Sequence, residues 1–130
     1  MKIAYFFIQN MANFVDNLTH WLIECYRVIR QMQTEDIEDV VSIERLVQTH
    51  PWSTQQFQDS LATYQCTVYE QANQVVGFCI LQPVLDEANL LLMAIHPDHH
   101  GKGLGYELLD YSIQQLKNNP IQIFLEVRES

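Results

Sequence analysis

Positive charge is scarce in this chain of 130 residues. Lysine and arginine together number 7, against 16 aspartates and glutamates, which gives a formal net charge of −9. Proteins that bind nucleic acids neutralise phosphates with clustered basic side chains. The composition therefore argues against a nucleic-acid partner and favours a cationic one.

Long apolar runs are also missing. The apolar segment at residues 3–8 is short, a single basic residue precedes it, and no small-residue cleavage site follows, so a secretory signal is not indicated. Polar residues from Asn10 to Glu24 interrupt the next segment too often for a membrane span. We expect a cytosolic protein without a membrane partner.

Cysteine is present, but the spacing of the cysteines follows no recognisable motif. Cys25, Cys66 and Cys79 are odd in number, form no Cys-x-x-Cys pair and lie in apolar stretches. This arrangement argues against a disulfide framework and predicts buried thiols in a reducing compartment.

Glycine is rare, yet three of the four glycines stand together, at Gly101, Gly103 and Gly105. They follow the apolar segment 93–95, which reads as a strand, and they precede a helical pattern. Glycines let a backbone turn sharply and bring its N–H groups close to phosphate oxygens, while the start of a helix attracts anions. The pattern therefore predicts a pyrophosphate cradle.

Two other phosphate motifs do not fit this turn. A Walker loop requires a hydroxyl residue after Gly-Lys, and none follows here. The dinucleotide fingerprint would require glycine at position 106, where the chain has Tyr106.

A metal site at the same turn is a further alternative. His96, Asp98, His99 and His100 carry groups that zinc accepts. They crowd one loop that phosphate binding already explains, whereas a metal centre needs spaced ligands on rigid elements. We therefore expect no metal.

The remaining periodicities give an order of elements. Residues 29–32 read as a strand, Thr34 caps a helix with Val40, Val41 and Val47 inward, and Ser53-Thr54-Gln55-Gln56 has the form of a capping box. Strands follow at 66–71 and 75–81, joined at Ala72-Asn73, and at 90–95 after a turn at Asp86-Glu87. A helix ends near Pro120, and residues 121–127 form the last strand.

The same pattern contains a group of acidic residues and one isolated glycine. The charges Glu35, Asp36, Glu38, Asp39 and Glu44 are interpreted as a solvated helix face. Gly77 marks a bulge or a close approach of two backbones.

The turn and the order of elements together resemble the GNAT N-acetyltransferases. His100-Gly101-Lys102-Gly103-Leu104-Gly105 matches the family's acetyl-coenzyme A motif, Gln/Arg-x-x-Gly-x-Gly/Ala, except at His100. The segments 50–53, 85–88 and 125–128 further resemble the bacterial ribosomal-protein alanine N-acetyltransferases. The resemblance covers about residues 29–130.

The resemblance implies an α/β (α+β) fold, a mixed and mostly antiparallel sheet with helices on both faces. The related enzymes continue beyond the last strand with an asparagine that contacts the cofactor, a helix carrying a proton-donating tyrosine, and two more strands. The sequence ends at Ser130, so we expect a GNAT domain at 28–130 without that last helix and those two strands. Residues 1–27 read as an added strand and helix.

The resemblance also implies the chemistry. It assigns contacts with acetyl-coenzyme A to residues at the end of the third strand and in the turn: Met93, Ala94, Ile95, Gly101, Lys102, Gly103, Leu104, Gly105 and Tyr106. Glu126 is the candidate base for a protein N-terminal amine, and a glutamate facing solvent is the alternative interpretation. Trp52 lies where the family's helix-helix loop shapes the acceptor site, or it is a packing anchor.

Two functions remain open at this point. One is acetylation of a protein N-terminus, with an alanine of a ribosomal protein as the acceptor. The other is a homologue that binds coenzyme A or a protein partner without turnover and is completed by strand exchange in a homodimer.

Overall fold

The computed structural model describes residues 27–117 and 122–125. The predicted extension at 1–27 lies outside the described residues, apart from Arg27. In chain order the elements are β1 (Arg27–Gln31), the short 3₁₀ helix η2 (Thr34–Asp36), α3 (Ile37–Val47), α4 (Thr54–Thr63), β2 (Gln65–Gln71), β3 (Gln74–Val84), β4 (Glu87–Ile95), the 3₁₀ turn η3 (Pro97–His99), α5 (Leu104–Gln114) and β5 (Gln122–Leu125). This order confirms the predicted one.

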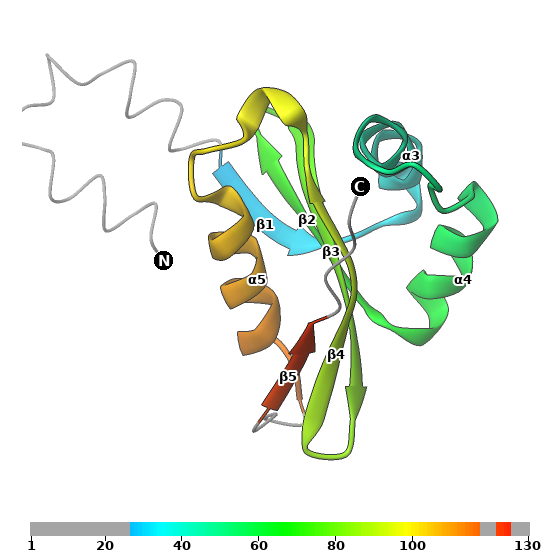
Figure 1. Ribbon diagram of the computed structural model, residues 1–130, viewed down its shortest axis with the longest axis vertical. Helices are drawn as coiled ribbons and strands as arrows, with labels where there is room; N and C mark the ends of the chain where they lie inside the picture. Colours follow the sequence, from blue (N-terminus) through cyan, green and yellow to red (C-terminus); the bar gives the residue numbers. More distant parts are fainter. Residues whose placement is uncertain (1–26, 118–121, 126–130) are drawn as a thin grey trace, which may run out of the picture.

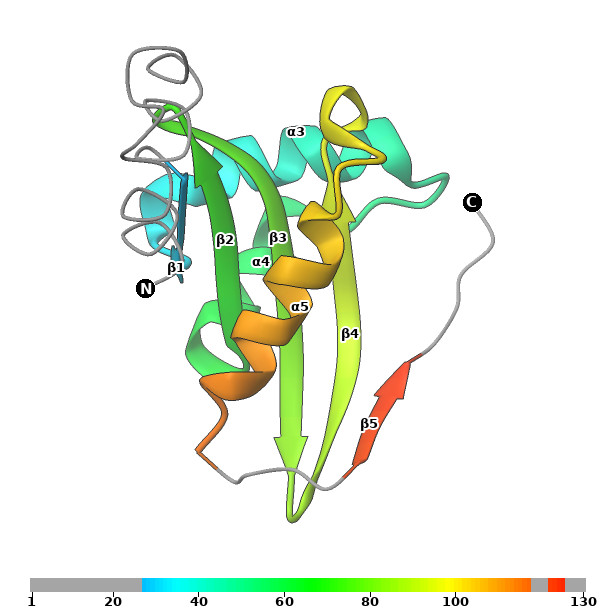
Figure 2. The ribbon, with the colours of Figure 1, turned by 90° about the vertical axis from the view of Figure 1, so that its left-hand side faces the viewer.

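The strands form one sheet in the order β1-β2-β3-β4-β5. The first four are antiparallel neighbours, and β5 pairs with β4 in parallel. Helices α3 and α4 lie on one face of the sheet and α5 on the other (Figures 1 and 2). The expected mixed sheet, covered on both faces, is thus confirmed. Within the described part of the chain, we find no helix with the length and apolar character needed to span a membrane.

Strand alternation divides the core into two layers. Val68, Phe78 and Ile80 pack with α3 and α4, whereas Tyr69 and Leu81 pack with α5. Both faces of the central strands are therefore buried.

The described cysteines are buried free thiols, as predicted. Burial raises the pKa of Cys66 and of Cys79 to about 12, so both thiols stay protonated at neutral pH. Cys25 lies outside the described residues.

The turn between β2 and β3 lies at Ala72-Asn73, as predicted. Both residues have positive φ, 52° and 64°, which fits the twist of a two-residue hairpin. The turn between β3 and β4 lies one residue earlier than expected, at Leu85-Asp86. Strand β4 therefore starts at Glu87 rather than Leu90, because β3 continues to Val84 and pairs with it there.

Gly77 has both of the predicted features. The register between β2 and β3 shifts beside it, where Val76 is the extra residue of a bulge. A Cβ atom at Gly77 would collide with Ile95 Cδ1 and lie 3.1 Å from the Ala94 carbonyl oxygen. A larger residue at Gly77 would require Ile95 to move and the backbones of β3 and β4 to shift slightly apart.

The interpretation of the charged helix face is wrong for Asp36. Asp36 is 6% exposed; its carboxylate accepts hydrogen bonds from Arg30 Nη1 at 2.7 Å and Nη2 at 2.9 Å, and from the Gln33 N–H at 2.7 Å. The predicted cap at Thr34 is therefore displaced by one residue, because Gln33 is the N-cap of the 3₁₀ helix η2. The α-helix α3 starts only at Ile37.

Glu44 is the second exception. Its side chain is fully buried, and its Oε2 accepts a hydrogen bond from the Trp52 N–H at 3.0 Å. A buried carboxylate requires such a partner, and the partner lies eight residues away, beyond the end of the helix.

Candidate active site

The turn between β4 and α5 starts where the sheet pairing ends. The His96 N–H donates to the Val76 carbonyl at 2.7 Å, one residue past β4. Pro97 then opens η3, and His96 Nδ1 accepts from the Asp98 N–H at 3.1 Å. The chain is thus held by hydrogen bonds on its way to the glycines.

Two glycines set the path of the turn. Gly101 and Gly103 have φ values of 79° and 76°, in the left-handed region that favours glycine. No atom lies within 4 Å of a Cβ built on either residue, so the backbone conformation, not a lack of space, requires glycine. The backbone here is accessible to a ligand.

Helix α5 starts directly after this turn, with Gly103 as its N-cap. Gly103 has no side chain with which to cap the helix, and the first bond of the helix backbone is Glu107 N–H to the Gly103 carbonyl. The N–H groups of Leu104, Gly105 and Tyr106 precede that bond and are free to bind an anion at the positive end of the helix dipole.

A side-chain network fixes the first turns of α5 to the sheet. Glu107 accepts hydrogen bonds from Arg27 Nη2 at 2.7 Å and from the Tyr69 hydroxyl at 3.1 Å. Arg27 Nε also donates to the Tyr69 hydroxyl at 2.6 Å. The turn therefore lies between two fixed ends, β4 and the start of α5.

His100 closes the turn onto the strand. Its Nε2 lies 2.6 Å from the Ile95 carbonyl oxygen. A carbonyl only accepts, so this ring nitrogen carries the proton and donates it. His100 thus stabilises the turn, a role that its position in the phosphate motif does not indicate.

The outer edge of β4 has a described partner along its first four residues. The described residues of β5, Gln122–Leu125, pair with Glu87–Leu90 of β4 (Figure 2). Just beyond, the register with β3 shifts between Ile80 and Leu81, which leaves Leu91 as the extra residue of a bulge. Among the residues that the structure describes, no strand pairs with this edge from 91 to 95.

The direction of the free backbone groups follows from the ladder. Antiparallel strands alternate between residues that bond the partner and residues that face away. Because the His96 N–H bonds Val76 on β3, the N–H and C=O groups of Ile95 and Met93 point away from β3. The hydrogen bond from His100 to the Ile95 oxygen agrees with this direction.

The open edge and the turn face a common cleft of about 330 Å³. Seven of the nine predicted cofactor residues line it: Met93, Ala94, Ile95, Gly101, Gly103, Leu104 and Gly105. Lys102 lies in the same turn and Tyr106 in the first turn of α5; both are exposed, but they do not line the cleft.

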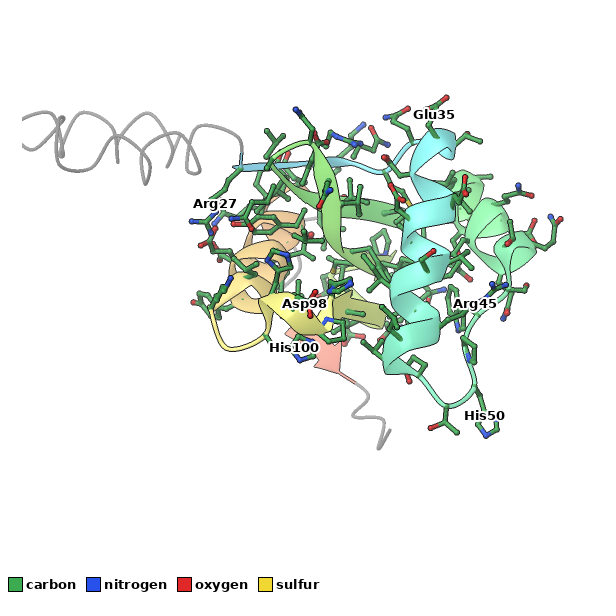
Figure 3. All side chains as sticks on the ribbon, turned by 90° about the horizontal axis from the view of Figure 1, so that it is seen from above. Arg27, Glu35, Arg45, His50, Asp98 and His100 are labelled. Carbon is green, nitrogen blue, oxygen red and sulfur yellow. The ribbon has the colours of Figure 1, made fainter. Side chains whose placement is uncertain are left out.

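Four further residues line the cleft that the sequence did not indicate as ligand contacts: Val47, Gln48, His99 and His100. Val47 and Gln48 come from the end of α3, which lies across from the turn carrying Asp98 and His100 (Figure 3). They are almost fifty residues away from the turn in sequence, and only the tertiary fold brings them there.

The histidines of the turn do not form a metal centre in the described part of the chain, where no group of three or more possible ligands comes together. Burial, with a smaller effect of the nearby Lys102 charge, lowers the pKa of His99. The imidazole of His99 is therefore neutral at pH 7.

The predicted base, Glu126, lies outside the described residues, and its role stays a prediction. The last described residue of β5 is Leu125, which directly precedes Glu126 in the chain.

Known proteins are similar to this chain in sequence and in fold. Residues 15–130 match the acetyltransferase (GNAT) family. The [ribosomal protein bS18]-alanine N-acetyltransferase of Haemophilus influenzae is 39% identical over 105 residues, which are 79% of this chain and 72% of that protein.

Solved structures are similar to this chain in fold. The ribosomal-protein-S18-alanine N-acetyltransferase from Escherichia coli superposes with a TM-score of 0.71 at 33% identity, covering 80% of this chain and 68% of that one. Ard1 from Thermoplasma volcanium gives a TM-score of 0.71 at 28% identity, with 79% and 72% covered. A bulged strand, a turn with two left-handed glycines and an uncapped helix start thus occur in a chain that belongs to the GNAT acetyltransferase family.

Proposed function

We propose that this protein acetylates the N-terminal amine of another protein, with acetyl-coenzyme A as the acetyl donor and the alanine of ribosomal protein bS18 as the acceptor. The relatives' names support this acceptor. The observation that carries the donor is the continuity of the cleft, in which the open edge of β4 leads into the anion cradle. The acceptor belongs to the cytoplasmic ribosome, which agrees with the cytosolic prediction.

The cradle fits the diphosphate of coenzyme A. The N–H groups of Leu104, Gly105 and Tyr106 are available at the helix start, and the left-handed Gly101 and Gly103 expose the backbone before it. Lys102 adds the positive charge of the turn. His100 donates to Ile95, so we assign phosphate binding to backbone amides rather than to its ring.

The edge of β4 fits the amide-containing arm of the cofactor. The backbone groups of Met93 and the N–H of Ile95 point away from β3 and can pair with amides as a neighbouring strand would; the Ile95 carbonyl already accepts from His100. An N–H on this edge would also stabilise the negative charge that develops on the thioester oxygen during attack by the amine.

Glu126 is the proposed base. An α-amine has a pKa of about 7.7–8.0, so part of the acceptor must lose a proton before it attacks. A carboxylate one residue past β5 would take that proton, directly or through a water molecule. Removing such a base lowers turnover by about 10²- to 10⁴-fold.

The test is thiol release from acetyl-coenzyme A with a peptide that starts with alanine, run beside a thermal shift with coenzyme A. We expect stabilisation and turnover. Glu126→Gln should lose turnover and keep the thermal shift, whereas the matched Glu129→Gln should change neither. Stabilisation without turnover would refute the transferase, and the absence of both signals would refute the cofactor site as well.

A further inference from the structure

The cleft has a second wall that the cofactor contacts do not use. The proposed cofactor groups all lie on β4, the turn and α5, whereas Val47 and Gln48 face them from the end of α3. These two residues begin the segment from Val47 to Ser53 that connects α3 to α4. This wall is therefore the side of the cleft that is left for the second substrate.

Glu44 holds this segment from inside the protein. Its side chain is fully buried one turn before the end of α3. Its Oε2 accepts the Trp52 N–H at 3.0 Å, and this bond spans the whole connection between the two helices. Loss of this oxygen would leave the Trp52 N–H without its partner.

Aromatic packing holds the same segment from its other end. The Trp52 ring lies 5.5 Å from that of Phe57, which meets Phe78 edge to face at 5.5 Å. Phe78 pairs with Ala94 on β4, beside the proposed cofactor edge. Trp52 is thus a packing anchor, and it belongs to the segment whose first two residues, Val47 and Gln48, line the cleft; its part in shaping the acceptor site stays a prediction.

We infer that Glu44 is a positioning residue, which fixes the Val47–Ser53 segment as the wall against which the acceptor N-terminus binds. The inference rests on the proposed function. Glu44 does not touch either substrate; it acts through the Trp52 backbone. Its loss should therefore weaken acceptor binding and leave the cofactor contacts intact.

The test compares two substitutions of Glu44. Glu44→Leu removes the acceptor oxygen at similar volume, and Glu44→Gln keeps an oxygen for the Trp52 N–H. In the peptide assay, we expect Glu44→Leu to raise the KM for the peptide about tenfold, the loss typical of such a bond, with the KM for acetyl-coenzyme A unchanged. Glu44→Gln should restore the peptide KM to within about threefold.

A second measurement tests whether Glu44 holds the segment, and it does not depend on turnover. With Trp21 replaced by Phe, fluorescence reports Trp52 alone, and Glu44→Leu should increase its quenching by acrylamide. Val40→Ala is the matched control, because it truncates a fully buried residue of the same helix and should lower stability without changing the ratio of the two KM values.

Three outcomes would overturn the inference: equal rises in both KM values, the same KM change in Val40→Ala, or unchanged quenching of Trp52 in Glu44→Leu. A wild-type chain without turnover would instead refute the proposed function, and the quenching would still decide whether Glu44 holds the segment.

Discussion

Three of the four glycines of this protein serve two different purposes at the scale of single residues. At Gly77, the end of β4 occupies the space of a side chain. Gly101 and Gly103 have free space around them and are needed for their positive φ. The same residue type thus answers a packing requirement at one position and a conformational requirement at two others.

The first prediction uses this distinction at Gly103. Gly103→Ala forces a Cβ into the left-handed region, so the free energy of unfolding should fall by about 1 kcal/mol. Gly103→Asn should lose less, because asparagine tolerates this conformation. Urea unfolding measures both variants. Equal losses for alanine and asparagine would contradict the role of φ.

Asp36 supplies a pH dependence. Its hydrogen bonds with Arg30, and a smaller contribution from the Gln33 N–H, lower the pKa of the carboxyl group, and burial opposes this only in part. The unfolded chain then binds protons more readily than the folded one between the two pKa values. Stability is therefore fully present above the unfolded value of about 3.9 and is lost as the pH falls through the lower folded value.

The second prediction follows from that sign. Asp36→Asn should be less stable than the wild type at pH 7, and the difference between the two should shrink as the pH falls below the unfolded value of about 3.9. Urea midpoints across this range measure it. Glu38→Gln, on the exposed face of α3, is the control, and a difference that grows toward low pH would be the contrary result.

Residue periodicity could not have found Asp36 and Glu44. Both carboxylates stand in a run of acidic residues that normally faces solvent, and each is buried because of one partner, Arg30 or the Trp52 backbone, outside the helix. A sequence pattern can predict the helix, but it cannot predict these partners.

Whole elements were predicted more reliably than their contacts. The capping box of α4 is formed as expected, with Ser53 Oγ accepting the Gln56 N–H and Gln56 Oε1 accepting the Ser53 N–H. The bulge at Leu91 was not predicted, because the run from Leu90 to Ile95 is apolar throughout and carries no register signal. Yet this bulge directly follows Leu90, the last residue of β4 that pairs with a described residue of β5, and β4 begins to line the cleft two residues later, at Met93.

The third prediction concerns the start of α5. Gly105 lies in the first turn of the helix, and a Cβ there would lie 3.8 Å from Ile95 Cγ1 and 4.0 Å from Met93 Cε, ordinary contact distances. Gly105→Ala should therefore raise the free energy of unfolding by up to about 1 kcal/mol, the difference in helix propensity. The thermal shift with coenzyme A should persist, because the backbone N–H is kept.

Gly105→Val is the matched comparison for this element. Its two extra methyl groups meet Ile95 and Met93, so Gly105→Val should not show the increase in the free energy of unfolding that is expected for Gly105→Ala. A destabilised Gly105→Ala protein would show that the start of α5 is strained.

At the scale of the whole molecule, the fold and half of the site were accessible from sequence. The glycine turn and the strand before it are adjacent in the chain, so a local pattern could predict that they bind one ligand. The opposite wall at Val47 and Gln48 joins them only through the packing of α3 on β4. Residue patterns contain no signal for that contact; only the family resemblance pointed to this connection, through Trp52.

The net charge of −9 leads to the last prediction. A protein with this charge attracts a cationic peptide over distances set by the ionic strength, and the screening length falls from about 30 Å at 0.01 M salt to about 10 Å at 0.1 M. Over this range the KM for an alanine-starting peptide rich in lysine and arginine should rise several-fold. The KM for an uncharged peptide with the same first residue should change little. Parallel changes for the two peptides would mean that the acceptor is bound through its N-terminus alone, without help from the acidic surface.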